Sequence, residues 1–191
     1  MTAALAGFVF LGLFSPGPNV ILLTASGARF GFRATVPHIL GVALGVGITA
    51  GVTGLGVGAL LLARPGLTLV LKIAACAWIL WMARALWLSD PVTRDARARP
   101  FTLLEAVLFQ WVNPKVWAVA LAATAFVAEL APGAKAVTLA LTFSVLNLGV
   151  CLFWTSAGAL LARLLADPLR WRLFMRGMAV ALAAFSVLVF L

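Results

Sequence analysis

Charged residues are scarce in this sequence. Lys, Arg, Asp and Glu make up 10% of the 191 residues, whereas apolar residues make up 64% and the mean hydropathy is +1.15. Globular domains average about a quarter charged and half apolar residues. A soluble protein of 20 kDa needs more polar surface than this composition can supply. We therefore exclude an ordinary soluble domain and expect residues 1–191 to form a single transmembrane domain.

Cysteines and enzyme motifs are also few. Cys76 and Cys151 are the two cysteines, and each lies within an apolar run. A disulfide framework is therefore excluded, and both thiols are expected in the core. The sequence has no phosphate-binding loop and no cluster of His, Cys, Asp and Glu. We expect neither an enzyme nor an ATP-driven pump, and no cofactor or metal centre.

Long apolar runs, separated by short polar breaks, fill most of the chain. An α-helix needs about 20 residues to cross the hydrocarbon core of a bilayer. The runs do not alternate polar with apolar residues, as the strands of a membrane barrel do. The expected fold class is therefore all-α, with six transmembrane helices at about 3–26, 37–62, 67–88, 103–127, 136–161 and 173–191.

Lys and Arg border the apolar runs and are distributed unevenly between the two sides. The loops after the first, third and fifth spans, with the adjoining helix ends, hold ten cations: Arg29, Arg33, Arg84, Arg94, Arg97, Arg99, Arg163, Arg170, Arg172 and Arg176. The second and fourth loops hold three: Arg64, Lys72 and Lys135. By the positive-inside rule we expect the odd loops in the cytoplasm and both termini in the periplasm, in a bacterial inner membrane. The net charge of +9 forms no continuous face, so we expect no nucleic-acid partner.

Two of the expected spans contain a proline motif near the middle. Pro16-Gly17-Pro18-Asn19 lies in the first and Asn113-Pro114-Lys115 in the fourth. Proline interrupts a helix, and free backbone groups at membrane depth must lie inside protein or along a cavity. Aligning Pro18 with Pro114 gives an offset of 96 residues, about half the chain. Two three-span halves, about 1–90 and 101–191, would then be inverted repeats, as in many secondary transporters. The alternative is that both motifs are kinks that shape the bundle.

Lys115 is the most informative single residue. It lies near the middle of the fourth expected span, where a cation costs at least ~2.5 kcal/mol and is a functional candidate by default. The alternative, that its side chain reaches the interface, requires too long a path. We expect Lys115 to bind a substrate carboxylate. Because desolvation disfavours the charged form of a lysine, Lys115 is also a candidate for proton coupling.

Several other residues within or beside the spans have more than one interpretation. Glu105, at the cytoplasmic end of the fourth span, is either a helix-terminal acid or a second proton-coupling candidate. Asn147 could join helices or contact substrate. His38 titrates near neutrality and is expected at the membrane interface. Glycines at every second to fourth position from Gly41 to Gly58 predict close helix packing.

At these motifs the sequence resembles the LysE/RhtB family of bacterial amino-acid exporters. The resemblance covers the whole chain and includes Pro16-Gly17-Pro18-Asn19, Gly54-Leu55-Gly56 and Asn113-Pro114-Lys115. The stretch from Phe109 to Trp117 and the Asn147-Leu148-Gly149 region most resemble the branch that exports cysteine and O-acetylserine. The resemblance implies amino-acid efflux driven by the proton motive force, from a fold of two inverted three-helix repeats.

Together the residues predict a secondary exporter of a small neutral amino acid or derivative. The expected partners are this substrate, protons and lipid, and a homo-oligomer is compatible with the sequence. One alternative is a metal-ion exporter of a related fold, which needs oxygen or sulfur ligands at the broken helices. Another is a membrane thiol–disulfide carrier, which needs cysteines that can meet. The expected substrate-binding residues are Pro16, Gly17, Pro18, Asn19, Asn113, Pro114, Lys115 and Asn147.

Overall fold

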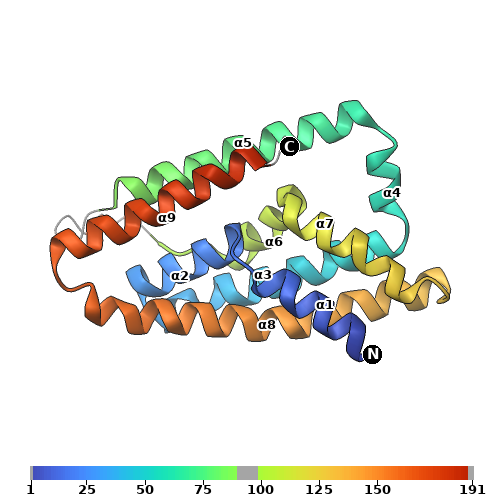
Figure 1. The fold of residues 1–191 in the computed structure, drawn as a ribbon, viewed down its shortest axis with the longest axis horizontal. Coiled ribbons are helices and arrows are strands. Elements are labelled where there is room, and N and C mark those ends of the chain that lie inside the picture. Colours follow the sequence, from blue (N-terminus) through green and yellow to red (C-terminus); the bar gives the residue numbers. More distant parts are fainter. Residues whose placement is uncertain (1, 90–98, 189–191) are drawn as a thin grey trace.

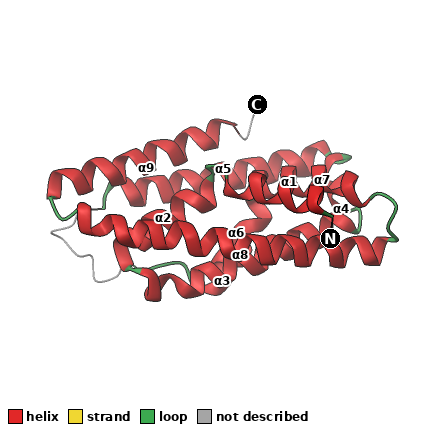
Figure 2. Ribbon diagram, turned by 60° about the horizontal axis from the view of Figure 1, so that its bottom comes forward, coloured by secondary structure: helices red, strands yellow, loops and turns green. Residues whose placement is uncertain are grey.

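The structure, a computed structural model, describes residues 2–89 and 99–188. Helices connected by short turns make up this part of the chain, which contains no strand (Figures 1 and 2). The all-α prediction is confirmed for these residues. The helices are α1 (Ala3–Phe14), α2 (Pro18–Phe30), α3 (Phe32–Gly54), α4 (Val57–Leu62), α5 (Pro65–Trp87), α6 (Leu103–Val112), α7 (Pro114–Ala123), followed by a 3-10 turn (Thr124–Val127), α8 (Pro132–Leu164) and α9 (Pro168–Leu188).

The described helices support part of the six-span prediction. Three helices, α3, α5 and α8, are each long and apolar enough to cross a bilayer, and the total rises to five if the bent pairs α1–α2 and α6–α7 each count as one span. The sixth expected span corresponds to α9, which has Arg170, Arg172 and Arg176 near its start. Residues 189–191 of that span lie outside the described residues. The second expected span ends early, because Gly56 has a φ of 93° and separates α3 from α4.

The two proline motifs interrupt their helices, as predicted. The first break leaves Ser15, Pro16 and Gly17 outside regular helix, and α1 and α2 differ in direction by 58°. At the second break, Asn113 alone separates α6 from α7, which differ by 68°. Asn113 has the extended conformation (φ −82°, ψ 103°) that a following proline favours. Pro18 and Pro114 begin the new helices, where a missing N–H leaves no hydrogen bond unmade.

Helix α3 is the centre of the bundle, and its glycines allow the close packing. Of its most apolar stretch 67% is buried, against 22% for α5. Gly41 and Gly45 face α6, where a Cβ on Gly45 would lie 2.8 Å from the Cα of Val107. Gly51 faces α8, where a Cβ would lie 3.2 Å from that of Ala140. The predicted packing role of the glycine stripe is therefore confirmed for these members.

The helices form two packed groups that share α2 and α6. One apolar core joins α1, α3, α7 and α8, and the other joins α5 and α9, which lie side by side in Figure 1. Many large apolar side chains remain exposed on the outer faces, including Leu141, Val145 and Leu160 on α8. Soluble monomers rarely expose such continuous apolar surface, so these faces are suited to lipid.

Candidate functional site

Lys115 connects the second helix break to the first. Its Nζ donates hydrogen bonds to the backbone carbonyl oxygens of Ser15 and Pro16, the latter at 3.3 Å. These carbonyls follow the carboxyl end of α1, where the helix dipole favours a cation. The lysine side chain lies across Gly17, where a Cβ would come within 2.7 Å of the lysine Cδ and 2.9 Å of Nζ. Glycine at this position therefore leaves the space that the lysine occupies.

Three amide side chains form a second link between the breaks. The Nδ2 of Asn19 donates to Oε1 of Gln110 at 2.8 Å, and Nε2 of Gln110 donates back to Oδ1 of Asn19 at 3.2 Å. Gln110 is fully buried, and Asn113 donates to the same Oε1 at 3.4 Å. Sequence reasoning did not assign a role to Gln110. The available signal was an uncharged amide one turn before the Asn-Pro break, in the apolar half of its helix.

Side chains of the second break also satisfy its own free backbone groups. Oδ1 of Asn113 accepts from the backbone N–H of Lys115 at 3.2 Å and thereby caps α7. The indole N–H of Trp117 donates to the carbonyl oxygen of Trp111 at 2.9 Å. The offset of 96 residues pairs Trp111 with Ser15. Thus both of these equivalent carbonyls accept hydrogen bonds from side chains on α7.

Asn147 completes a small cavity between the breaks. The cavity offers about 10 Å³ to the centre of a water-sized sphere, roughly the room of a single water. Asn147 is 2% exposed, and its Nδ2 has no hydrogen-bond partner among the described residues. The walls of the cavity come from Leu13, Gly17, Asn19, Val20, Asn113, Lys115, Val116 and Asn147.

The structure thus brings most of the expected site residues to one place. Gly17, Asn19, Asn113, Lys115 and Asn147 line the same cavity. The other three shape the breaks: the carbonyl of Pro16 accepts from Lys115, and Pro18 and Pro114 begin helices.

A larger cavity lies on the other side of the second break, between α5 and α7. It measures about 210 Å³, and Lys72 and Thr68 contribute polar groups to a mostly apolar wall. Pro114, Trp111 and Trp117 form the wall nearest the break. Lys72 was not among the expected site residues. The break therefore has a cation on each side, Lys115 and Lys72.

Glu105 is a helix-terminal acid, which was one of the two interpretations of this residue. Its carboxylate accepts from the backbone N–H of Thr102, and Thr102 caps α6 in return. Both carboxylate oxygens also accept from Arg99, each at 2.7 Å. These bonds raise the pKa of the exposed Arg99 above its usual value. Proton coupling by Glu105 stays a prediction.

His38 is buried within the protein, and its expected position at the membrane interface stays a prediction. It is 2% exposed and packs against the ring of Phe101, with 5.0 Å between the ring centroids. The apolar segment before α6 covers it, a long-range contact that no local pattern indicates. Of the two cysteines, both free, Cys151 is buried as expected, whereas Cys76 is only half-buried.

Broken helices that meet around a small polar cavity are a feature of many membrane transporters. The LysE type translocator family matches residues 10–191. The chain therefore belongs to this family of transporters, and it is a multi-pass membrane protein.

Curated relatives agree with this assignment. The cysteine/O-acetylserine efflux protein of Escherichia coli K12 is 27% identical over 165 residues, which cover 82% of each chain. The protein of the same name from Klebsiella pneumoniae is 28% identical over 116 residues, 61% of this chain and 59% of the relative. No solved structure matches the chain.

Proposed function

We propose that this protein exports a small neutral amino acid, or a derivative of one, from the bacterial cytoplasm, driven by the proton motive force. The observation that carries the proposal is the position of Lys115. Its ammonium group lies between two broken helices and beside a cavity lined by Asn19, Asn113 and Asn147. The relatives named as cysteine/O-acetylserine efflux proteins support a neutral substrate.

The chemistry of the site suits an amino-acid backbone. A substrate carboxylate would replace the carbonyls of Ser15 and Pro16 as the partner of Lys115, since charge-assisted hydrogen bonds are stronger than neutral ones. Amide oxygens of the asparagines can accept from the substrate ammonium group. The residues that line the cavity include no carboxylate, so a cationic side chain would find no partner there. A lysine-like substrate is therefore disfavoured.

Substrate binding requires the two breaks to separate. A cavity with room for about one water is far smaller than the ~300–1,000 Å³ of typical ligand pockets. The breaks provide bends of 58° and 68° about which the half-helices can move. The matched positions of the breaks support two inverted repeats, about residues 1–90 and 101–191, and the cation distribution supports an inner-membrane protein with periplasmic termini. Lys115 and Glu105 are the proton-coupling candidates of this proposal.

The test is transport by purified protein in proteoliposomes with an imposed pH gradient. Wild-type protein should accumulate labelled cysteine or O-acetylserine, but not lysine. Lys115→Ala should lower the rate at least tenfold while the protein still inserts and melts cooperatively. Lys135→Ala is the matched control, because Lys135 lies on α8 and its Nζ donates to the carbonyl of Ala128, away from the two breaks. Wild-type rates in Lys115→Ala would show that Lys115 is a packing residue and that the proposed site is wrong.

A further inference from the structure

His38 is a buried titratable group with no partner for either ring nitrogen. Nδ1 and Nε2 form no hydrogen bond to any described residue, although the side chain is 2% exposed. A neutral imidazole has one donor and one acceptor, and leaving both unpaired in the interior costs free energy. A phenylalanine would fill the same space without this cost. The unpaired imidazole therefore points to a role in which its nitrogens are used.

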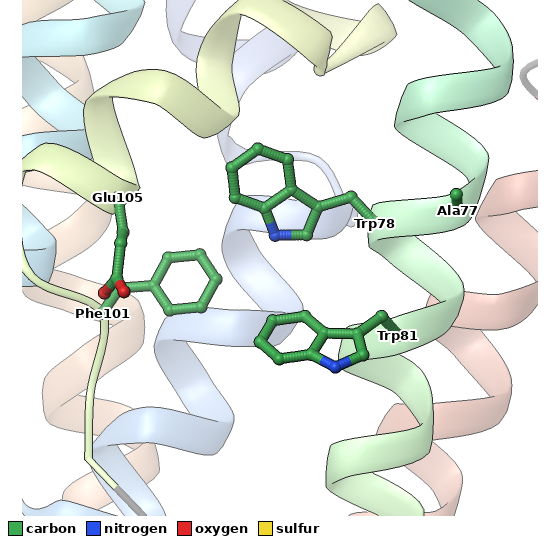
Figure 3. Close-up of a pocket in the computed structure, with 5 residues that line it drawn as sticks. All are labelled: Ala77, Trp78, Trp81, Phe101 and Glu105. Carbon is green, nitrogen blue, oxygen red and sulfur yellow. The ribbon is translucent and has the colours of Figure 1, made fainter.

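A single aromatic ring separates His38 from an open pocket. The pocket measures about 410 Å³ and lies between α5 and the start of α6. Figure 3 shows Trp78 and Trp81 on one side, with the ring of Phe101 and the carboxylate of Glu105 opposite them. Phe101 also contacts His38. A change in the side-chain torsions of Phe101 would therefore open His38 to the pocket.

The charge next to this ring is negative. The Glu105 carboxylate on α6 attracts a protonated His38 and so offsets part of the larger cost of charging a buried imidazole. The capping bonds of Glu105 and its ion pair with Arg99 hold it in place. The other charged groups on the helices that pack against α3 are cations: Arg29 on α2, Lys115 on α7, and Lys135 and Arg163 on α8, together with Arg33 on α3 itself. On α8 the buried core includes the thiol of Cys151.

His38 also lies on the helix interface that leads to the transport site. On α3, Gly41 packs against Ala106 and Gly45 against Gln110. Gly45 is seven residues from His38, roughly 10 Å along the helix. The α3–α6 contact thus connects the imidazole to the amide network that joins the two breaks. A change in the distance between α3 and α6 near His38 can therefore alter the packing of these helices near Gln110.

We propose that His38 is a proton-binding residue of the transport cycle, which exchanges its proton with the Glu105 pocket when Phe101 moves aside. In the uptake step a ring nitrogen accepts a proton from a hydronium ion in the pocket, which leaves as water, and the imidazole becomes a cation that the Glu105 carboxylate attracts. Release reverses this transfer. The inference rests on the proposed function, since it assigns a residue to the coupling of export to protons.

Two transport assays of the His38→Phe variant distinguish a loss of proton coupling from a loss of substrate binding. Counterflow of labelled for unlabelled substrate at equal pH needs no net proton movement, and it should stay within about twofold of wild type. Accumulation driven by a pH gradient should fall to the equilibrium level. Trp171→Phe is the control, because it also removes a buried, unpaired N–H but from α9, and both activities should persist. Gradient-driven accumulation by His38→Phe at the wild-type level would overturn the proposal.

A direct titration covers the case in which His38→Phe fails to fold. The chain has one histidine, so selective nitrogen-15 labelling of untagged protein reports His38 alone by NMR. The proposal predicts that its protonation between pH 5 and 8 changes when cysteine is added, because proton and substrate binding must be linked reciprocally. It also predicts that Phe101→Ala speeds carbethoxylation of His38 at least tenfold. An imidazole that stays neutral with and without cysteine would contradict the proposal. Absence of both counterflow and gradient response in wild-type protein would instead contradict the proposed function.

Discussion

Several polar side chains at the two helix breaks form pairs that join one break to the other. Gln110 and Asn19 exchange two hydrogen bonds, although they lie 91 residues apart in the sequence. Lys115 contacts carbonyls 99 and 100 residues away. Buried polar groups are costly unless paired. These long-range bonds therefore hold the breaks together as well as line the site.

Replacing Gln110 should weaken the fold. Gln110→Leu removes the partner of Asn19 and of the buried Asn113, and unsatisfied groups of this kind cost roughly 1–3 kcal/mol. We expect a lower melting temperature in detergent, measured by tryptophan fluorescence, together with slower transport. Leu104→Ala on the same helix is the control, because Leu104 is exposed, and it should lower the melting temperature by less than half as much. Equal effects would show that the amide network adds no stability.

The space beside Lys115 should restrict which cation can replace it. The lysine Nζ would lie 2.9 Å from a Cβ at Gly17, and a guanidinium group is wider and planar. Lys115→Arg should therefore retain less than about a tenth of the wild-type export rate. Gly17→Ala should reduce the rate in the same direction while leaving the lysine present. Initial export rates in proteoliposomes measure both variants. Full activity in Gly17→Ala would show that export does not require the Lys115 side chain to lie across residue 17.

At the scale of elements, the packing depends on backbones that approach closely. Helices α2 and α8 cross where Gly27 faces Thr155 and Gly158 faces Thr24, each glycine against a backbone carbonyl of the opposite helix. Small residues at such crossings allow helices in membranes to pack by van der Waals contact and polar bonds. The crossing lies on the two helices that also contribute Asn19 and Asn147 to the site.

Replacing either of two glycines of α8 with alanine should change the stability of the protein, but in opposite directions. Gly158→Ala places a methyl group against the carbonyl oxygen of Thr24, which belongs to a helix and cannot turn away. We expect a clear loss of stability or of folded protein. Gly149→Ala meets nothing within 4 Å and should stabilise the helix by up to about 1 kcal/mol. The melting temperatures of both variants, measured in the same detergent, test this prediction. A Gly158→Ala variant as stable as wild type would mean that α2 and α8 do not approach as closely as described.

At the scale of the whole molecule, the described helix ends alternate between two sides. The ends of α2, α5 and α8 lie toward the left in Figure 1, and the N-terminus lies at the right. This alternation agrees with chain segments that cross a bilayer repeatedly. The expectation that the odd loops face the cytoplasm rests on the distribution of Lys and Arg alone.

Fusion proteins test that orientation. With ten cations in the odd loops and three in the even ones, alkaline phosphatase fused to the C-terminus should be active, because it requires export to the periplasm. A fluorescent protein that folds only in the cytoplasm should be dark at the same position. A fluorescent fusion with inactive phosphatase would reverse the proposed topology.

The sequence was sufficient to predict the features with a local cause. Proline predicted both breaks, glycine spacing predicted close packing on α3, and apolar runs predicted the helices. Contacts between distant segments could not be predicted in the same way. The role of Gln110 depends on Asn19, and the burial of His38 depends on Phe101. Neither pair shares a helix, so no periodicity connects its members.

The bond from Lys115 to the carbonyls of Ser15 and Pro16 also bears on how an empty carrier resets. A carrier that achieves net efflux must return to the cytoplasmic side without cargo. A lone buried ammonium would oppose that return, because it would have to be desolvated without a counter-charge. Here the peptide carbonyls of the first break replace the missing carboxylate. We therefore expect the empty protein to reorient, which would allow net efflux without the exchange of one amino acid for another.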